Sequence, residues 1–335
     1  MHAFLDVREC EGIQAPRRRI SPQQRREKIN TDKSFYMARS HHSRRNTKFK
    51  KVVFRGYTDG LFKTPEIRGE KEEHLGILGP VIKAEYGQSI MVVFKNKANR
   101  PFSLHPNGVS YTKWTEGLSY EDSSKPWYRD DNEVPPNGNF TYIWKVPRRP
   151  AHSPDEPHCQ TWTYYSGVNP DIHSGLIGPL LVCPEGTLKN VTNTREFALL
   201  FMTFDESGAL DPILKETLQF HSINGITFSL KGLKMYTNQL IRWHLINMGS
   251  PKDFQSIHFH GQTFFHTTTT SNRHAVYPFA TLEMYASKPG LWQLETEIGI
   301  NQQRGMQTLF LVLDSGTTYS LSSTSSRTLN AIRSL

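Results

Sequence analysis

Two histidines one residue apart carry the clearest chemical signal in this chain of 335 residues. His258 and His260 flank Phe259, and side chains two residues apart on a strand point to the same face. Their imidazoles can therefore converge on one ion, and imidazole suits copper and zinc. The alternative is that one histidine faces a polar cavity and the other is a hydrogen-bonded core residue. The spacing by itself leaves both interpretations open.

A group of charged residues in the first half could bind a harder ion. It lies in a loop-rich stretch and consists of Lys113, Glu116, Asp122, Asp130 and Asp131. Calcium takes about six to eight oxygen ligands, and several carboxylates in one loop could supply them. The alternative, which we favour, is an acidic loop that is simply solvated.

The elements that would position these groups are short strands. The chain holds 23 Gly and 20 Pro, and it shows no long apolar helical pattern. Short strands separated by turn residues are typical of a sandwich or barrel, so the expected fold class is all-β. The clearest strands are expected at residues 49–54, 89–96, 140–146, 161–165, 176–182, 196–204, 240–247 and 306–313.

An internal repeat divides the chain into two similar units. Each unit has a strand that ends in Asn, at Asn96 and at Asn247, followed by a loop and a strand that bears His. Self-similarity of this kind is typical of duplicated domains. We expect a first domain at residues 47–187 and a second at residues 194–314.

The two ends of the chain differ from its middle. Residues 1–46 are polar and basic, residues 315–335 are rich in Ser and Thr, and both segments are predicted to be disordered. The formal net charge of +9 is concentrated in residues 8–51, which argues against a general nucleic-acid-binding surface. Charged side chains interrupt the first ten residues, so they are not expected to form a signal peptide.

Cysteines and glycosylation triplets favour an extracellular protein. Cys159 and Cys183 flank a strand-like region and make a reasonable disulfide, with Cys10 left over. The alternative is three reduced thiols. Asn139 and Asn190 each begin an Asn-x-Thr glycosylation triplet. No apolar run is long enough to span a bilayer, and we expect a secreted protein whose signal peptide is not in this chain.

Several motifs resemble one protein family. Three of them are similar to a cupredoxin domain of the multicopper-oxidase family: residues 258–261, 288–292 and 305–308. Three more resemble the third A domain of the factor V type, within the factor V/factor VIII/ceruloplasmin branch: residues 73–80, 171–180 and 232–236. The resemblance covers residues 49–313 and implies two tandem cupredoxin-like (plastocyanin-like) Greek-key β-barrels that form one A domain.

The resemblance has two departures. The connection between residues 204 and 220 looks shorter than in the family. The discoidin-like C domains that follow the A domain in the family are not in this sequence. Because the family binds membranes mainly through those C domains, a membrane role is expected only through them.

The resemblance also points to chemistry that this chain lacks. Copper oxidases carry His-Cys-His after the Pro-Gly-x-Trp turn, and the Cys thiolate binds an electron-transfer copper. The matching residues here are Glu295, Thr296 and Glu297. A Thr hydroxyl cannot replace a thiolate, which disfavours the alternative of a ferroxidase-like oxidase. Met306, at the position of the axial ligand, is interpreted as a core residue.

One metal site of the family is implied to survive. The resemblance implies a structural copper ion held by His258 and His260, with the carboxylate of Glu295 as the third ligand. A loop of the family's first A domain binds calcium, which supports the calcium candidate around Lys113.

The family implies a non-enzymatic role in blood coagulation. A protein of the factor V type holds a factor Xa-like serine protease and prothrombin together, which raises effective concentration and orientation. The expected partners are that protease, prothrombin and the factor V heavy chain. A factor VIII-like cofactor, which would accelerate a different protease, is the alternative.

Overall fold

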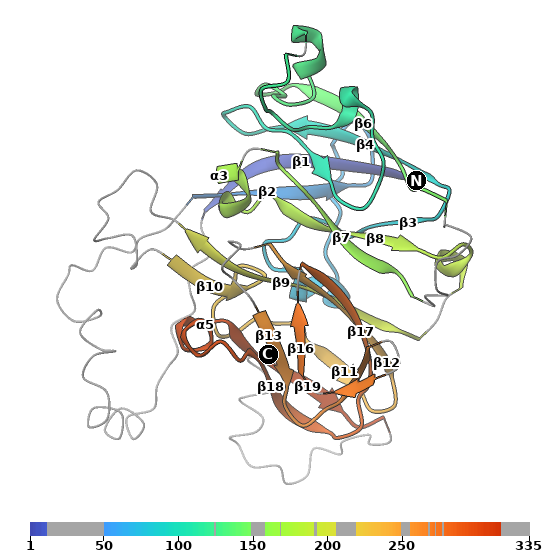
Figure 1. Cartoon of the computed structure of the whole chain (residues 1–335), viewed down its shortest axis with the longest axis vertical. Helices are drawn as coiled ribbons and strands as arrows, with labels where there is room; N and C mark the ends of the chain where they lie inside the picture. Colours follow the sequence, from blue (N-terminus) through green and yellow to red (C-terminus); the bar gives the residue numbers. More distant parts are fainter. Residues whose placement is uncertain are drawn as a thin grey trace, which may run out of the picture.

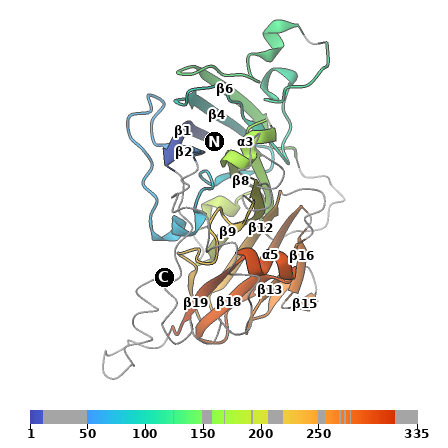
Figure 2. The same cartoon turned by 90° about the vertical axis from the view of Figure 1, so that its left-hand side faces the viewer.

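The computed structural model describes most of the chain in two β-barrels that lie end to end (Figures 1 and 2). The described residues are 1–11, 50–123, 125–148, 158–167, 169–190, 193–205, 219–248, 255–266, 269–271, 273–276 and 278–315. Among them, no helix has the length and apolar character needed to cross a bilayer.

The first barrel packs two four-stranded sheets against each other. The order of one sheet is β2-β1-β4-β6, and that of the other is β3-β8-β7-β5. Burial alternates along β4 and β6, as a strand with one core face requires. The strands are β1 His2–Glu11, β2 Lys50–Tyr57, β3 Ile82–Glu85, β4 Ser89–Asn96, β5 His105–Pro106, β6 Asn139–Lys145, β7 Gln160–Tyr165 and β8 Ile177–Cys183.

The second barrel has a six-stranded sheet and a five-stranded sheet. Their orders are β10-β9-β12-β17-β14-β15 and β11-β19-β18-β13-β16. The strands are β9 Arg195–Asp205, β10 Gln219–Ile223, β11 Lys234–Tyr236, β12 Leu240–Asn247, β13 Gln255–Phe259, β14 Phe264–His266, β15 Thr269–Ser271, β16 Arg273–Val276, β17 Phe279–Tyr285, β18 Gly290–Thr296 and β19 Gln307–Leu313. The all-β prediction of two cupredoxin-like barrels is confirmed.

Short helical turns connect the strands. The α-helices are α3 Asn169–Ser174 and α5 Gly299–Arg304. The 3-10 turns are η1 Glu70–Leu75, η2 Lys113–Thr115, η3 Pro126–Arg129 and η4 Thr187–Lys189. Helix α5 connects β18 to β19, which are neighbours in the sheet that also contains β13 (Figure 2).

Three apolar clusters hold the barrels together. Each barrel has its own core, which centres on Trp144 in the first and on Trp243 in the second. A third cluster joins the barrels through η1 and β9, with Leu75 and Leu200 both fully buried. Burial of apolar side chains is the dominant favourable contribution to such packing. The two barrels therefore form one continuous body.

The first strand corrects one prediction. Residues 1–11 were expected to belong to a disordered leader, yet His2–Glu11 forms β1 in the middle of a sheet. It pairs antiparallel with β2 and parallel with β4. The buried carboxylate of Asp6 made this segment look polar, but Arg8 and Lys97 neutralise it at 2.8 Å and 2.9 Å. The rest of the predicted leader and nearly all of the predicted tail lie outside the described residues.

Candidate functional site

His258 lies on β13 and His260 directly follows that strand, in a segment where burial alternates residue by residue. Ile257 and Phe259 are fully buried in the core of the second barrel, while His258 and His260 are half-buried on the other face. Gly261, in the turn after β13, has φ +70°, and an added Cβ would lie 2.2 Å from the ring of Trp292. Only glycine combines this left-handed turn with such a close approach.

The three predicted copper ligands come together. His258 lies opposite Glu295 in the β13–β18 ladder. The imidazole centroids of His258 and His260 are 4.0 Å apart, and His260 Nε2 lies 2.8 Å from Glu295 Oε1. One ligand atom from each of the three residues lies within 4.8 Å of the others. Two imidazoles and a carboxylate fit a borderline divalent ion such as copper or zinc.

Neighbouring side chains fix the carboxylate. Gln293 and Gln302 both donate a side-chain hydrogen bond to Glu295. Such outer contacts orient a ligand before an ion arrives. Neither residue was predicted from the sequence. No local pattern marks Gln302, because it reaches Glu295 only through the turn of α5 back onto β18.

The local environment of His258 favours the neutral imidazole that binds metal. Burial, together with the nearby His260 and Arg273, lowers the pKa of His258. A lowered pKa keeps an imidazole neutral, which is the form that binds metal.

The residues that replace the oxidase ligands are structural. Thr296 is fully buried, and its hydroxyl donates a hydrogen bond of 2.7 Å to Gln255. Met306 is fully buried in the core of the second barrel, which confirms its interpretation as a core residue. A hydroxyl cannot supply the soft thiolate ligand of an electron-transfer copper.

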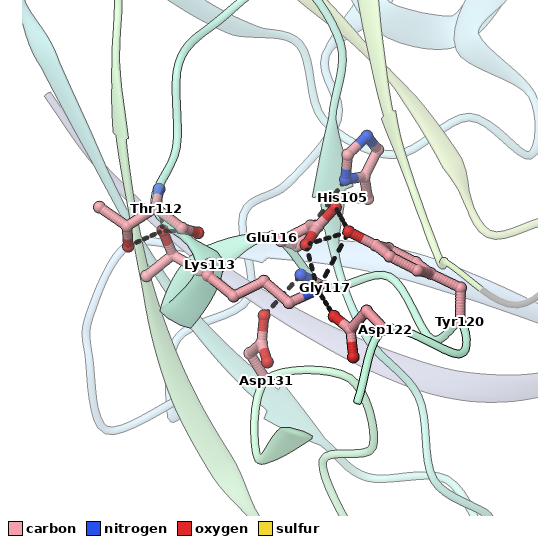
Figure 3. A network of polar contacts seen from close by, with 9 residues as sticks. His105, Thr112, Lys113, Glu116, Gly117, Tyr120, Asp122 and Asp131 are labelled. Atoms are coloured by element: carbon pink, nitrogen blue, oxygen red, sulfur yellow. Dashed lines mark hydrogen bonds and ion pairs between the residues drawn. The ribbon is translucent and has the colours of Figure 1, made fainter. Parts of the chain in front are cut away.

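The acidic loop of the first barrel is arranged around an ammonium group (Figure 3). Lys113 Nζ lies 2.7 Å from Glu116 Oε2 and 2.5 Å from Asp122 Oδ2, and it also donates to the hydroxyl of Tyr120. Although burial opposes it, these contacts raise the pKa of Lys113 above its ordinary value. Three of the five calcium candidates therefore meet, with a lysine as their cation.

The other two calcium candidates are placed differently. Asp131 is buried, and it accepts a hydrogen bond of 2.6 Å from the backbone N–H of Gly117. Burial raises its pKa. Asp130 is exposed at the end of η3. The five candidate side chains therefore do not converge on one point with their oxygens. Calcium binding at this loop stays a prediction.

The remaining predicted sites are accessible or bonded as expected. Cys159 and Cys183 form a disulfide, which confirms that prediction. By the chain-entropy model, closing a loop of this length stabilises the fold by about 3 kcal/mol. Asn139 and Asn190 are both exposed, as glycosylation requires, and their modification stays a prediction.

Polar contacts also join the barrels. The side chain of Asn224 donates to the backbone carbonyls of His74 and Ala198 at 2.6 Å and 2.8 Å. Burial and the charge of Arg195 lower the pKa of His74 to about 3. His74 therefore stays neutral inside the junction.

A family model and solved structures both relate this chain to multicopper oxidases. The family model described as "Multicopper oxidase" matches residues 75–186. A crystal structure of a multicopper oxidase has a TM-score of 0.60 and 17% identity, covering 93% of this chain and 88% of that one. That likeness shows the cupredoxin-like fold alone.

Sequence relatives are more similar. Coagulation factor V of Homo sapiens is 48% identical over 293 residues, which are 80% of this chain and 13% of that protein. The venom prothrombin activator pseutarin-C non-catalytic subunit of Pseudonaja textilis is 47% identical over 291 residues, 80% of this chain and 20% of that protein. Coagulation factor VIII of Sus scrofa is 43% identical over 297 residues, 79% of this chain and 14% of that protein.

The chain thus spans 13% to 20% of the length of the factor V relatives that it matches. The predicted resemblance to coagulation factor V is therefore confirmed over 80% of this chain. The match to the multicopper-oxidase family model agrees with it.

Proposed function

We propose that this chain acts as a non-enzymatic coagulation cofactor domain of the factor V type. Its relatives include coagulation factor V and the non-catalytic subunit of a venom prothrombin activator. The proposed partners are a factor Xa-like serine protease, prothrombin and a factor V heavy chain. The proposed location is extracellular, where the Cys159–Cys183 disulfide is stable.

One observation supports the proposal: Thr296 is fully buried, and the family resemblance matches it to the Cys that binds the electron-transfer copper in oxidases. Electron transfer needs that soft ligand, so the barrels are left with binding surfaces rather than redox chemistry. A cofactor of this kind raises the reaction rate by positioning the protease and its substrate together.

We further propose that His258, His260 and Glu295 hold one structural copper ion. When bound, the ion would supply three bonds between the end of β13 and β18. Gln293 and Gln302 hold the carboxylate toward the imidazoles. Because ligand binding to the native state alone stabilises that state, the ion is expected to raise the melting temperature of the second barrel.

A prothrombin activation assay tests the cofactor role. The assay contains factor Xa, anionic phospholipid vesicles, prothrombin and a factor V heavy chain, with or without this chain. Thrombin formation is expected to rise with the concentration of the chain and then to saturate. Replacing factor Xa and prothrombin by the factor VIII-dependent protease and its substrate tests the alternative cofactor.

The proposal would be overturned if the chain neither changed that rate nor bound factor Xa or the heavy chain in a surface plasmon resonance measurement. An absorption spectrum tests the enzymatic alternative separately. Copper-loaded protein is expected to lack the intense blue band of a copper–thiolate site, and such a band would restore the oxidase interpretation.

A further inference from the structure

A second pair of close imidazoles lies in the same barrel. The ring centroids of His266, on β14, and His274, on β16, are 4.3 Å apart with an interplanar angle of 48°. The His258 and His260 rings are 4.0 Å apart at 36°. The two pairs therefore have similar spacing, although the second pair comes from two strands instead of one.

The two pairs lie on opposite faces of the β13–β16 ladder. In that ladder His258 is opposite Arg273, and Ile257 is opposite His274. Paired residues share a face, and successive residues alternate between faces. Because Ile257 is a fully buried core residue, His274 points to the inner side, away from the His258 cluster. The two pairs are separate sites.

The second pair joins the two sheets of the barrel. Strand β14 belongs to the six-stranded sheet and β16 to the five-stranded sheet. His274 also contacts Phe264 edge-on, with centroids 6.1 Å apart. Both imidazoles are half-buried. The pair is thus held by packing on one side and remains partly accessible.

A cavity adjoins His266 at the junction of the barrels. It has a volume of about 340 Å³, and its wall includes His266 and Phe279 from the second barrel and His158 and Trp162 from the first. A bound water occupies only about 30 Å³, so the cavity has room for waters beside His266. His158 is not counted as a ligand, because the described residues offer only the His258 set as three ligand atoms within 4.8 Å.

The local environment also favours neutral imidazole. Burial and the neighbouring His266 lower the pKa of His274. Neutral imidazole is the metal-binding form.

We propose that His266 and His274 form a second site for a borderline divalent transition metal ion, with water from the adjoining cavity in the remaining coordination positions. Imidazole nitrogen suits Cu²⁺ and Zn²⁺, and open positions filled by water are common for both. The ion would cross-link β14 and β16, and thus the two sheets of the second barrel.

Copper titration in a variant without the first site tests this proposal. The variant is His258→Ala/His260→Ala. Every protein also carries Cys10→Ser, so that a thiol does not reduce Cu²⁺, and His2→Gln, so that the amino-terminal amine and imidazole do not chelate it. Isothermal titration calorimetry is expected to show one remaining Cu²⁺ per chain. Adding His274→Gln or His266→Gln is expected to weaken this binding more than about tenfold, as loss of one of two imidazole ligands requires.

The matched control is His173→Gln, which removes a half-buried imidazole from α3 in the first barrel and is expected to leave the titration unchanged. Circular dichroism and melting without metal show whether each variant is folded. If the folded His266 and His274 variants bind Cu²⁺ like the parent variant, the proposal is wrong.

Electron paramagnetic resonance gives a readout that needs no further substitution. Cu²⁺ bound to the variant without the first site is expected to show hyperfine coupling to two imidazole nitrogens. Coupling to fewer than two would overturn the assignment. Since the first site is absent from this protein, the result is independent of whether His258 and His260 bind copper.

Discussion

Each barrel has one cluster of side chains that was predicted to bind a metal ion, but the two clusters differ in where the positive charge comes from. In the first barrel, the ammonium of Lys113 contacts Glu116 and Asp122 directly. In the second barrel, Glu295 faces two imidazoles within 4.8 Å, and burial keeps His258 toward its neutral form. The first cluster already contains its cation, whereas the second presents converging ligand atoms to one from outside.

This comparison shows why a count of acidic residues is a weak metal signal. The first cluster offers more carboxylates than the second, yet a lysine occupies the space between them. The second offers one carboxylate, held by two glutamine side chains. Preorganised ligands lose little freedom on binding an ion. What distinguishes the clusters is the placement of neighbours rather than their composition.

Removing the imidazoles of the second cluster should have the largest effect. His258→Ala and His260→Ala are each expected to weaken copper binding at this site by more than about 100-fold, because each removes a direct ligand. Elemental analysis after dialysis and calorimetric titration measure the loss. Copper content at background in the unsubstituted protein, together with unchanged titrations in both variants, would contradict the contrast between the clusters.

His74, at the junction of the barrels, is a histidine that burial keeps neutral outside both clusters. The lowered pKa of His74, about 3, means that the unfolded chain binds the proton more readily than the native state below about pH 6.5. Stability should therefore fall as the pH falls, by about 2 kcal/mol from this group at pH 5. Urea unfolding between pH 5 and 8 measures the slope.

His74→Gln is the variant that isolates this group. It lacks the titrating imidazole, so its stability should depend less on pH over the same range, whatever its stability at pH 8. Glu196 acts at lower pH, because its ion pairs with His244 and Lys83 outweigh burial and lower its pKa to about 2. Equal slopes for the variant and the unsubstituted protein between pH 5 and 7 would exclude His74 as the source.

Much of the fold could be predicted from the sequence, because alternation and turns are local. The repeat built on Asn96 and Asn247 is real: each ends an equivalent strand, and each amide donates to a carbonyl of a nearby loop or strand. Strand β1 was missed because its buried Asp6 depends on Lys97, far along the chain. A polar residue can be recognised as a core residue only when its partner is known.

The candidate site was predictable only in part, for the same reason. The alternation rule placed His258 and His260 on one face, and the family motif placed Glu295 opposite them. The role of Gln302 depends on the turn of α5, and the place of Lys113 depends on how its loop folds. Both contacts join segments whose relative positions cannot be predicted from the sequence alone.

Replacing the lysine of the first cluster tests whether its ammonium acts as the cation. Lys113→Met leaves Glu116 and Asp122 without their counter-charge, and we expect a loss of about 1–2 kcal/mol in unfolding free energy. Millimolar calcium should stabilise this variant but not the unsubstituted protein. Thermal melting with calcium or a chelator measures both effects.

The matched control for that experiment is Lys125→Met. Lys125 lies in the same loop region, with its ammonium 5.0 Å from the ring centroid of Trp127, so the substitution changes the net charge equally. A similar calcium response in both variants would indicate general charge screening. Stabilisation of the unsubstituted protein by calcium would instead show that the loop binds the ion with Lys113 displaced, and the contrast between the barrels would fail.

Replacing one of the glutamines that contact Glu295 should have the smallest effect on copper affinity. Gln302→Leu removes a side-chain hydrogen bond to Glu295 but leaves the three ligands in place, so copper affinity should fall by about tenfold, within the range for outer contacts. Gln303→Leu is the control, because Gln303 is the exposed neighbour on α5. If both variants bind copper like the unsubstituted protein, the carboxylate is oriented by β18 alone. The second cluster would then differ from the first only in lacking a lysine, and not in being held ready for an ion.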